Sequence, residues 1–270
     1  MSFDVEEFVR YQVANAPVRP YPFPHFYVRP VFPDDFYREL LANLPRTEMM
    51  ETIGEHGTVG HVDKETGKFV LGSNDPRYIA ELSTLEKDEE VNGRGHLWRD
   101  LSVWLLGDAF YELLLQKFRI GIGERFGEGV RLVTDVDARF VRDFHQYKIR
   151  PHTDRPTKLV SLLFYLPANL SLSHHGTVIY RPIDPTLRCE GHTQHPFRLF
   201  RKVATMPFAP NSVFGFFKTD HSFHGVEEIK DERIERNVLL YNLYVRKVVA
   251  PRPREAGRTI WPWARKPRAA

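Results

Sequence analysis

A histidine and an aspartate two residues apart, His152 and Asp154, open the stretch HTDRPTKLVSLLFYLP. The apolar run from Leu159 to Leu166 that follows is typical of a buried strand. In a strand, side chains at positions i and i+2 lie on one face. His152 and Asp154 can therefore offer one imidazole nitrogen and one carboxylate oxygen to a single metal ion. A second histidine would complete a two-histidine, one-carboxylate triad, the type of site that holds non-heme Fe(II) and leaves coordination positions open.

A triplet of this kind also arises by chance in a chain with 12 histidines. The sequence contains a second one, His61-Val62-Asp63. That triplet lies in a glycine-rich stretch with no β-rich run behind it, whereas His152 precedes a strand and, further on, the segments HSFHGVEEI and ERNVLLYNLYV. The context therefore favours His152 and Asp154.

These segments resemble a known family. HTD, SLLFYLP, FHGV and RNVLLYNLYV together are similar to the Fe(II)/2-oxoglutarate-dependent dioxygenases, with the best likeness to the prolyl-hydroxylase-like branch. The likeness covers about residues 140–247, and PYPFPHFYVRPVFPDDFYRELL resembles the entry segment of that branch. It implies a double-stranded β-helix, a jelly roll of eight strands in two packed sheets that is also the cupin architecture. It further implies Fe(II) as the metal, and 2-oxoglutarate and O2 as co-reactants.

The third metal ligand is expected to be His224 rather than His221. The two histidines are three residues apart, so on a regular strand they face opposite sides. His221 follows a polar, turn-like stretch, whereas His224 is followed by Gly225, which permits close approach of the backbone. The FHGV context and the 12-residue step from His224 to Arg236 also match the metal histidine of the family. His221 is then expected near the site or on the surface.

Three further residues are candidates for binding the cosubstrate. The distal carboxylate of 2-oxoglutarate needs a buried cation, and arginine pairs with a carboxylate through two parallel hydrogen bonds. The resemblance places Arg236 in this role, with Tyr165 as a hydrogen-bond donor to the same carboxylate. Asn242, six residues after Arg236, should share its face of one strand and line the cavity. The alternatives are an ion pair of Arg236 with Glu232 or Glu235, a core tyrosine, and an amide bonded to a neighbouring loop.

The length and bulk composition are those of a soluble enzyme with one large domain, or with a core and an appended piece. Of 270 residues, 42% are hydrophobic, yet no run approaches the roughly 18 apolar residues of a membrane span. No secretory signal is visible at the N-terminus, and the one cysteine, Cys189, excludes an internal disulfide. We therefore expect a cytoplasmic protein without membrane contact.

The chain divides into three expected regions. Residues 1–129 form a helical and loop region packing on the core, residues 130–249 the double-stranded β-helix, and residues 250–270 a basic, proline-rich tail. The fold class is α+β, because helices precede a run of short strands. Helices are expected over 3–14, 34–44, 77–86 and 98–119, and strands over 131–135, 138–149, 158–166, 176–181, 198–207, 212–217, 223–229 and 236–249. Residues 51–76 are interpreted as an excursion with a hairpin around residues 65–68, either a substrate-covering lid or a plain surface hairpin.

The formal charge of +3 is uneven along the chain. From Arg246 onward eight basic residues oppose Glu255 alone, a balance of +7, which leaves 3 − 7 = −4 for the rest. We interpret the tail as a solvated segment, and nucleic-acid binding, which rests on this tail alone, is not favoured. Trp261 and Trp263 suggest that the tail docks on its own body or on a second copy of the chain, which would make a homodimer.

The functional prediction is a 2-oxoglutarate-dependent dioxygenase that hydroxylates an unactivated C–H bond and releases succinate and CO2, as the resemblance implies. Asp154 is present, which favours hydroxylation over halogenation, because halogenating relatives replace this acid with a small residue. The sequence leaves a small molecule, an amino-acid side chain or a peptide open as substrate. The alternative from another class is a non-oxygenase, cupin-like metal-binding protein, either a binder or an isomerase, which would not need the Arg236 and Tyr165 anion site.

Overall fold

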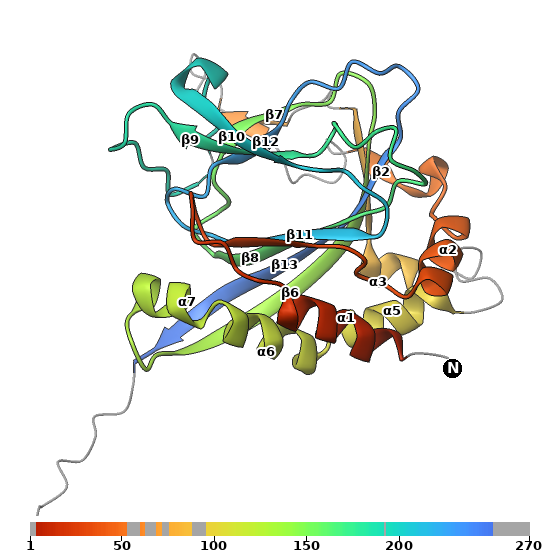
Figure 1. Cartoon of the computed structure of the whole chain (residues 1–270), viewed down its shortest axis with the longest axis horizontal. Helices are drawn as coiled ribbons and strands as arrows, with labels where there is room; N and C mark the ends of the chain where they lie inside the picture. Colours follow the sequence, from red (N-terminus) through yellow and green to blue (C-terminus); the bar gives the residue numbers. More distant parts are fainter. Residues whose placement is uncertain are drawn as a thin grey trace, which may run out of the picture.

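Two antiparallel β-sheets packed face to face form the centre of the molecule (Figure 1). The computed structural model describes residues 4–52, 60–62, 69–71, 76–87, 96–191 and 193–250. In sheet order, the larger sheet contains β1 (His25–Val28), β11 (Ser212–Phe217), β8 (Lys158–Tyr165), β13 (Arg236–Val249), β6 (Arg131–Asp143), β5 (Arg77–Glu81) and β2 (Glu51–Thr52). The smaller sheet contains β10 (Phe200–Met206), β9 (Thr177–Pro182), β12 (His224–Val226) and β7 (Ile149–His152).

The last eight strands alternate between the two sheets in the order of a double-stranded β-helix. The chain passes from β6 in the larger sheet to β7 in the smaller one, back to β8, on to β9 and β10, back to β11, then to β12 and finally to β13. The central strands of the larger sheet therefore come from distant parts of the sequence, and β13 pairs with both β6 and β8. The predicted jelly-roll core is confirmed. Within it, β6 runs unbroken from 131 to 143, where two strands were expected.

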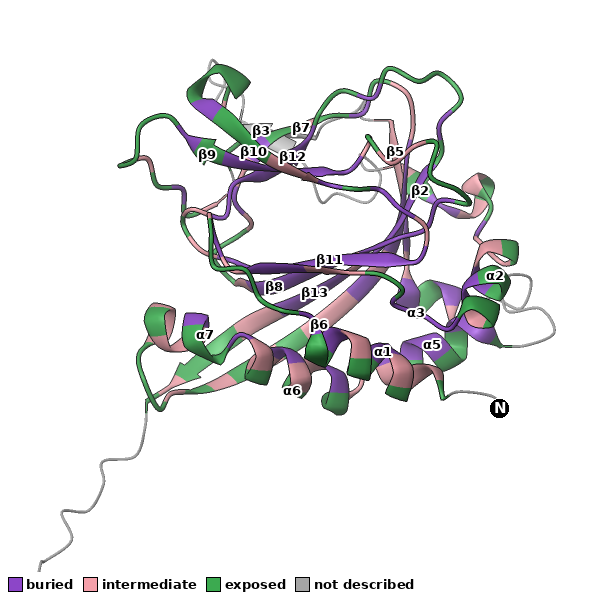
Figure 2. Cartoon of the chain, viewed as in Figure 1, coloured by how far each residue is buried: buried purple, intermediate pink, exposed green. Residues whose placement is uncertain are grey.

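Alternation along the strands separates two apolar layers. On β8, Leu162 and Phe164 pack with the helices, whereas Leu163 and Tyr165 face the smaller sheet. On β13, Leu239 and Tyr241 likewise belong to the helix side and Val238 to the interior. Each strand is buried on both faces, which explains why β8 reads as a continuous apolar run (Figure 2). The interior face consequently carries the residues that can reach a ligand.

Helices cover the outer face of the larger sheet (Figure 1). They are α1 (Val5–Asn15), α2 (Asp34–Ala42), α3 (Leu82–Leu85), α5 (Leu97–Leu105), α6 (Asp108–Lys117) and α7 (Arg119–Phe126). The described residues also form two 3-10 turns, η1 (Thr47–Met49) and η2 (Phe197–Leu199), and η2 directly precedes β10 of the smaller sheet. Phe110 of α6 meets Tyr241 of β13 edge to face, with ring centroids 5.3 Å apart. Within the described residues, no helix is both long enough and apolar enough to cross a membrane.

Two helix predictions are wrong. The helix expected over 98–119 is divided at Gly107, whose extended backbone ends α5 and begins α6. A Cβ at Gly107 would lie 3.0 Å from the Val103 carbonyl oxygen, so the chain turns tightly there. The helix expected over 77–86 is strand β5 followed by the short α3, because residues 77–81 pair with β6 and this tertiary pairing outweighs the local helical pattern.

The region around residues 51–76 is described in part. β3 (Gly60–Val62) and β4 (Phe69–Leu71) pair as a two-stranded antiparallel sheet, in agreement with the expected hairpin. The turn expected at residues 65–68 lies outside the described residues, as does the basic tail from residue 251 onward, with Trp261 and Trp263.

Candidate active site

The three predicted metal ligands come together at the edge of the space between the sheets. His152 ends β7, His224 begins β12, and the two residues are Cα partners in adjacent strands. Their ring centroids are 4.4 Å apart. Asp154 follows two residues after His152, and one ligand atom from each of the three lies within 4.8 Å of the others. Among the described residues, no other group of three histidine, cysteine or acidic side chains converges in this way.

Backbone carbonyls fix the orientation of both imidazoles. Nδ1 of His152 lies 2.9 Å from the Arg150 carbonyl oxygen, and Nδ1 of His224 lies 2.9 Å from that of Ser222. A carbonyl oxygen can only accept a hydrogen bond, so each Nδ1 carries the proton and each Nε2 keeps its lone pair. This arrangement holds the tautomer and ring orientation that a metal-binding histidine requires.

Two side chains hold the carboxylate of Asp154. The Ser161 hydroxyl donates to Oδ2 at 2.7 Å, and the Lys158 ammonium donates to Oδ1 at 3.2 Å. Burial opposes ionisation of Asp154, but the Lys158 charge and the two imidazoles together hold its pKa well below the usual range. The carboxylate is therefore ionised near neutral pH and can bind a cation.

Both histidines are neutral near pH 7. Burial, and next the neighbouring His224, lower the pKa of His152 to about 3. Burial likewise lowers the pKa of His224. Metal ligation needs a neutral imidazole and an ionised carboxylate, so this donor set is already in the required protonation states. Two imidazoles and one carboxylate fit Fe(II), whose charge they reduce from +2 to +1.

The close contact of β12 with β7 depends on a glycine. A Cβ added at Gly225 would lie 2.5 Å from the Ile149 carbonyl oxygen. The predicted use of Gly225 for close backbone approach is thus what the strand pairing requires. Of the rival triplet, His61 lies in β3, and Asp63 is outside the described residues.

The predicted anion-binding residues lie on the same interior surface and are fully buried. The Tyr165 hydroxyl donates to Thr177 Oγ1 at 2.7 Å, and Arg236 Nη2 lies 3.4 Å from the same oxygen. Burial raises the pKa of Tyr165 to about 12, so its hydroxyl stays protonated. The contact of 3.4 Å is long for an N–H···O bond, which leaves this guanidinium N–H available for a better acceptor.

Arg236 is also an ion-pair partner, but not of the residues expected from the sequence. Its Nη1 donates to Asp143 Oδ2 at 2.7 Å and its Nε to the His175 carbonyl oxygen at 2.8 Å. Asp143 also accepts from Arg77, with distances of 2.5 and 3.0 Å. The two guanidiniums and one carboxylate sum to +1, so this buried cluster retains a positive charge. Glu235 instead lies 3.4 Å from Arg142.

Asn242 lies where its spacing predicts, on the interior side of β13. It is 1% exposed and its Cα partner across β8 is Ser161, the residue that holds Asp154. Its Nδ2 donates to Asp137 Oδ1 at 2.6 Å, whereas its buried Oδ1 has no hydrogen-bond partner among the described residues. A buried acceptor of this kind is a place for a donor from a ligand.

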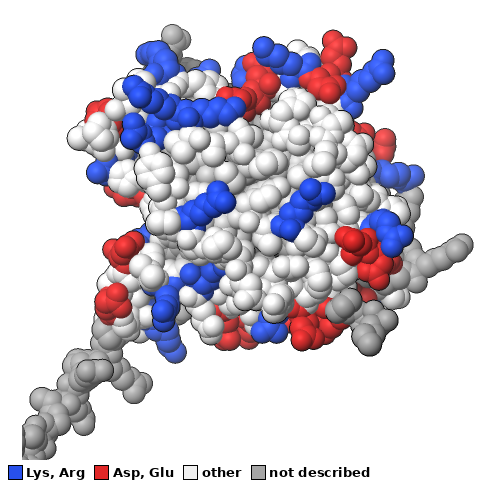
Figure 3. All heavy atoms as spheres, in the orientation of Figure 1, with Lys and Arg blue, Asp and Glu red and all other residues white. Residues whose placement is uncertain are grey.

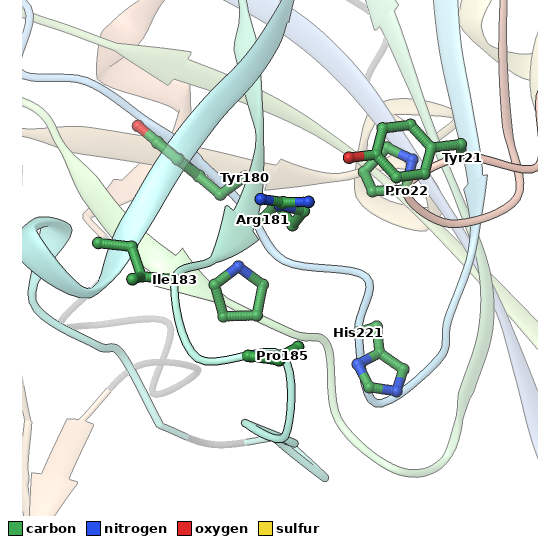
Figure 4. A pocket seen from close by; sticks show the side chains of 8 residues that line it. Tyr21, Pro22, Tyr180, Arg181, Ile183, Pro185 and His221 are labelled. Atoms are coloured by element: carbon green, nitrogen blue, oxygen red, sulfur yellow. The ribbon is translucent and has the colours of Figure 1, made fainter.

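A pocket of about 330 Å³ is lined by residues close in sequence or strand register to the metal ligand His224 (Figure 4). Its lining includes His221, which precedes His224 by three residues, and Arg181, which follows the Cα partner of His224, Ile179, by two. Tyr21 and Pro22, from the loop before β1, form the opposite wall (Figure 4). His221 is half-buried here, and burial lowers its pKa.

Sequence reasoning did not find Arg181, Ser161 or Tyr21. For Arg181 and Ser161 the sequence did hold a signal, because each lies in an expected strand at an alternate position that shares the inward face. Tyr21 carries no such signal, since it lies in a proline-rich loop that only the fold brings to the pocket.

No protein-family model and no curated protein matches the sequence. Solved structures similar to the chain include a prolyl-4-hydroxylase from Pseudomonas putida, 15% identical, with a TM-score of 0.45, over 88% of this chain and 100% of the other. A 2OG-Fe(II) oxygenase family protein from Burkholderia pseudomallei is 17% identical, with a TM-score of 0.41, over 82% and 84%. The non-heme alpha ketoglutarate dependent epimerase SnoN from nogalamycin biosynthesis is 12% identical, with a TM-score of 0.48, over 92% and 83%. At identities of 12–17% the activity of this chain has to be argued from its own residues.

Proposed function

We propose that the protein is an Fe(II)/2-oxoglutarate-dependent dioxygenase that hydroxylates an unactivated C–H bond of a small molecule or an amino-acid side chain. The observation that carries the proposal is the convergence of His152, Asp154 and His224 within 4.8 Å, on the same interior surface that buries Arg236 and Tyr165. A metal site alone would fit many proteins. The additional buried positive charge is what a dicarboxylate cosubstrate requires.

Each residue has a defined part in this proposal. His152, Asp154 and His224 would hold Fe(II), and Ser161 would keep the Asp154 carboxylate in place. Fe(II) and 2-oxoglutarate, when bound, supply the oxidising chemistry by activating O2, with succinate and CO2 as co-products. The protein contributes binding, orientation and exclusion of competing reactions.

Arg236 and Tyr165 would hold the distal carboxylate of 2-oxoglutarate. Both side chains are at most 1% exposed, so a charge-assisted hydrogen bond there would be little screened by water. Asp143 neutralises one of the two guanidiniums around it, and the remaining positive charge complements one carboxylate. Asn242 would accept a hydrogen bond from bound substrate or cosubstrate through its buried Oδ1, for which the described part of the chain supplies no donor.

The alternative remains a metal-binding jelly roll without oxygenase activity, either a binder or an isomerase. The neutral imidazoles and the ionised carboxylate are compatible with it, because they would hold other divalent ions as well. The Arg236, Tyr165 and Thr177 cluster has no role in that alternative.

Turnover of 2-oxoglutarate to succinate, measured with Fe(II) and O2 against a panel of metabolites and peptides, tests the proposal. We expect succinate formation that depends on added Fe(II), that a subset of the panel stimulates, and that H224A abolishes. Metal binding without succinate formation under any condition would favour the non-oxygenase alternative.

A further inference from the structure

One face of β9 carries residues next to three parts of the site: the Tyr165 cluster, the metal ligands and the pocket. Thr177, Ile179 and Arg181 occupy alternate positions, and alternate residues of a strand share a face. Thr177 contacts the Tyr165 hydroxyl, and Ile179 is the Cα partner of the metal ligand His224. At about 3.3 Å per residue, Arg181 lies roughly 7 Å further along the strand than Ile179. Arg181, which is exposed, therefore lies beyond the metal-ligand residues on the side opposite to the Tyr165 cluster, and it lines the pocket.

A second guanidinium lies next to Arg181. Arg201 of β10 is its direct Cα partner, so both side chains leave the sheet on the same side. Like charges placed opposite one another in a sheet destabilise it, and within the described part of the chain neither arginine makes a side-chain hydrogen bond or ion pair. Figure 3 shows basic side chains gathered at the end of the molecule where Figure 1 places β9 and β10.

The acidic residues near the pocket are engaged elsewhere. Asp184 accepts hydrogen bonds from the backbone N–H and hydroxyl of Thr186, and Asp220 accepts one from Lys218. On the outer face of the same sheet, Lys202 pairs with Glu227 at 2.8 Å. The unpaired charge of Arg201 is thus on the pocket side of β10, whereas the charge of Lys202 on the opposite side is neutralised by Glu227.

The remaining walls of the pocket are largely apolar or aromatic. Ile183, Pro185 and the ring of Tyr21 surround the Arg181 guanidinium (Figure 4). A volume of about 330 Å³ is at the small end of the range for pockets that enclose small molecules. Among the residues that the structure describes, no acidic side chain lines the pocket, which disfavours a cationic ligand.

We infer that the substrate is a small molecule with an apolar or ring-containing body and one carboxylate or phosphate group, which Arg181 binds with support from Arg201. This inference rests on the proposed function for the reaction at the metal, but the anion site itself does not depend on it. Binding at Arg181 would place the body of the molecule between the anion site and the metal ligands, so that its C–H bonds face the metal.

Calorimetric titration of three matched probes tests the inference. Benzoate, phenyl phosphate and the neutral benzamide share one ring, and each is titrated anaerobically into protein loaded with Fe(II) and saturating 2-oxoglutarate. We expect at least one of the two anions to bind about tenfold or more tightly than benzamide, because a hydrogen bond to a charged group is lost in the amide. The better anion identifies a carboxylate or a phosphate substrate.

The variants R181Q and K202Q separate a specific site from general surface charge. Both remove one positive charge from the same sheet, but only R181Q removes it from the pocket. We expect R181Q to weaken binding of the anion about tenfold and K202Q to leave both binding and basal succinate formation unchanged. Equal binding of anion and amide, no binding of either anion, or equal effects of the two variants would overturn the inference. Arg181-dependent anion binding without metal-dependent binding of 2-oxoglutarate would leave the anion site standing and refute the proposed function instead.

Discussion

Replacing Ser161 with alanine should weaken metal binding without removing any metal ligand. The Ser161 hydroxyl is buried and donates to Asp154 Oδ2 at 2.7 Å. A hydrogen bond to a charged group contributes about 1.5–3 kcal/mol, and each 1.4 kcal/mol corresponds to about a factor of ten in affinity. We therefore expect S161A to bind Fe(II) about 10- to 100-fold more weakly, the range also found when residues supporting a metal ligand are replaced.

The assay is an anaerobic titration of the apo-protein with Fe(II) in competition with a chelator of known affinity. S212A is the matched control, because Ser212 is equally buried on the adjacent strand β11 and donates to the Ala209 carbonyl oxygen at 2.7 Å, away from the metal ligands. Thermal unfolding of both variants verifies that they fold. Wild-type metal affinity in S161A, or an equal loss in S212A, would refute the role given to Ser161.

Four further substitutions test other parts of the structure. H224A should abolish Fe(II) binding and turnover with the fold intact, whereas H221A should keep Fe(II) binding; the reverse result in metal titrations would show that the assignment is wrong. R236A should weaken 2-oxoglutarate binding about 30-fold or more, because one partner of a buried charge pair is lost. It should also lower the free energy of unfolding by on the order of 3 kcal/mol, since Asp143 loses a partner. Equal losses of iron and cosubstrate affinity in calorimetry would point to a folding role alone. F110A should lower the free energy of unfolding by about 3–5 kcal/mol in urea titrations, with turnover per folded molecule retained; unchanged stability would contradict the packing of α6 on the sheet.

The jelly-roll core and the convergence of the three metal-ligand residues were predicted through the family resemblance of HTD, SLLFYLP, FHGV and RNVLLYNLYV, with support from local regularities. The i, i+2 spacing indicated that His152 and Asp154 could reach one ion, although β7 ends at His152 and Asp154 lies just beyond it. Gly225 indicated the close strand contact next to His224. The alternation along β13 also placed Arg236 and Asn242 on one face. Patterns of this kind are local, so they are visible without the fold.

Features that depend on contacts between distant segments could not be predicted. The partner of Arg236 is Asp143, 93 residues earlier in the chain, whereas the sequence suggested only its neighbours Glu232 and Glu235. Residues 77–81 have a locally helical pattern but pair with β6, and that pairing brings Arg77 to Asp143. A helix or an ion pair predicted from neighbouring residues is wrong where a residue distant in the sequence forms a stronger interaction.

The most direct test of the central claim is an anaerobic titration of 2-oxoglutarate into the protein with and without Fe(II), followed by calorimetry and visible absorption. If His152, Asp154 and His224 hold Fe(II) and Arg236 receives the distal carboxylate, 2-oxoglutarate should bind tightly only to the Fe(II)-loaded protein and produce a weak visible metal-to-ligand band. Fe(II) binding with no band and no metal-dependent binding of 2-oxoglutarate would contradict the account and leave a cupin-like metal-binding protein.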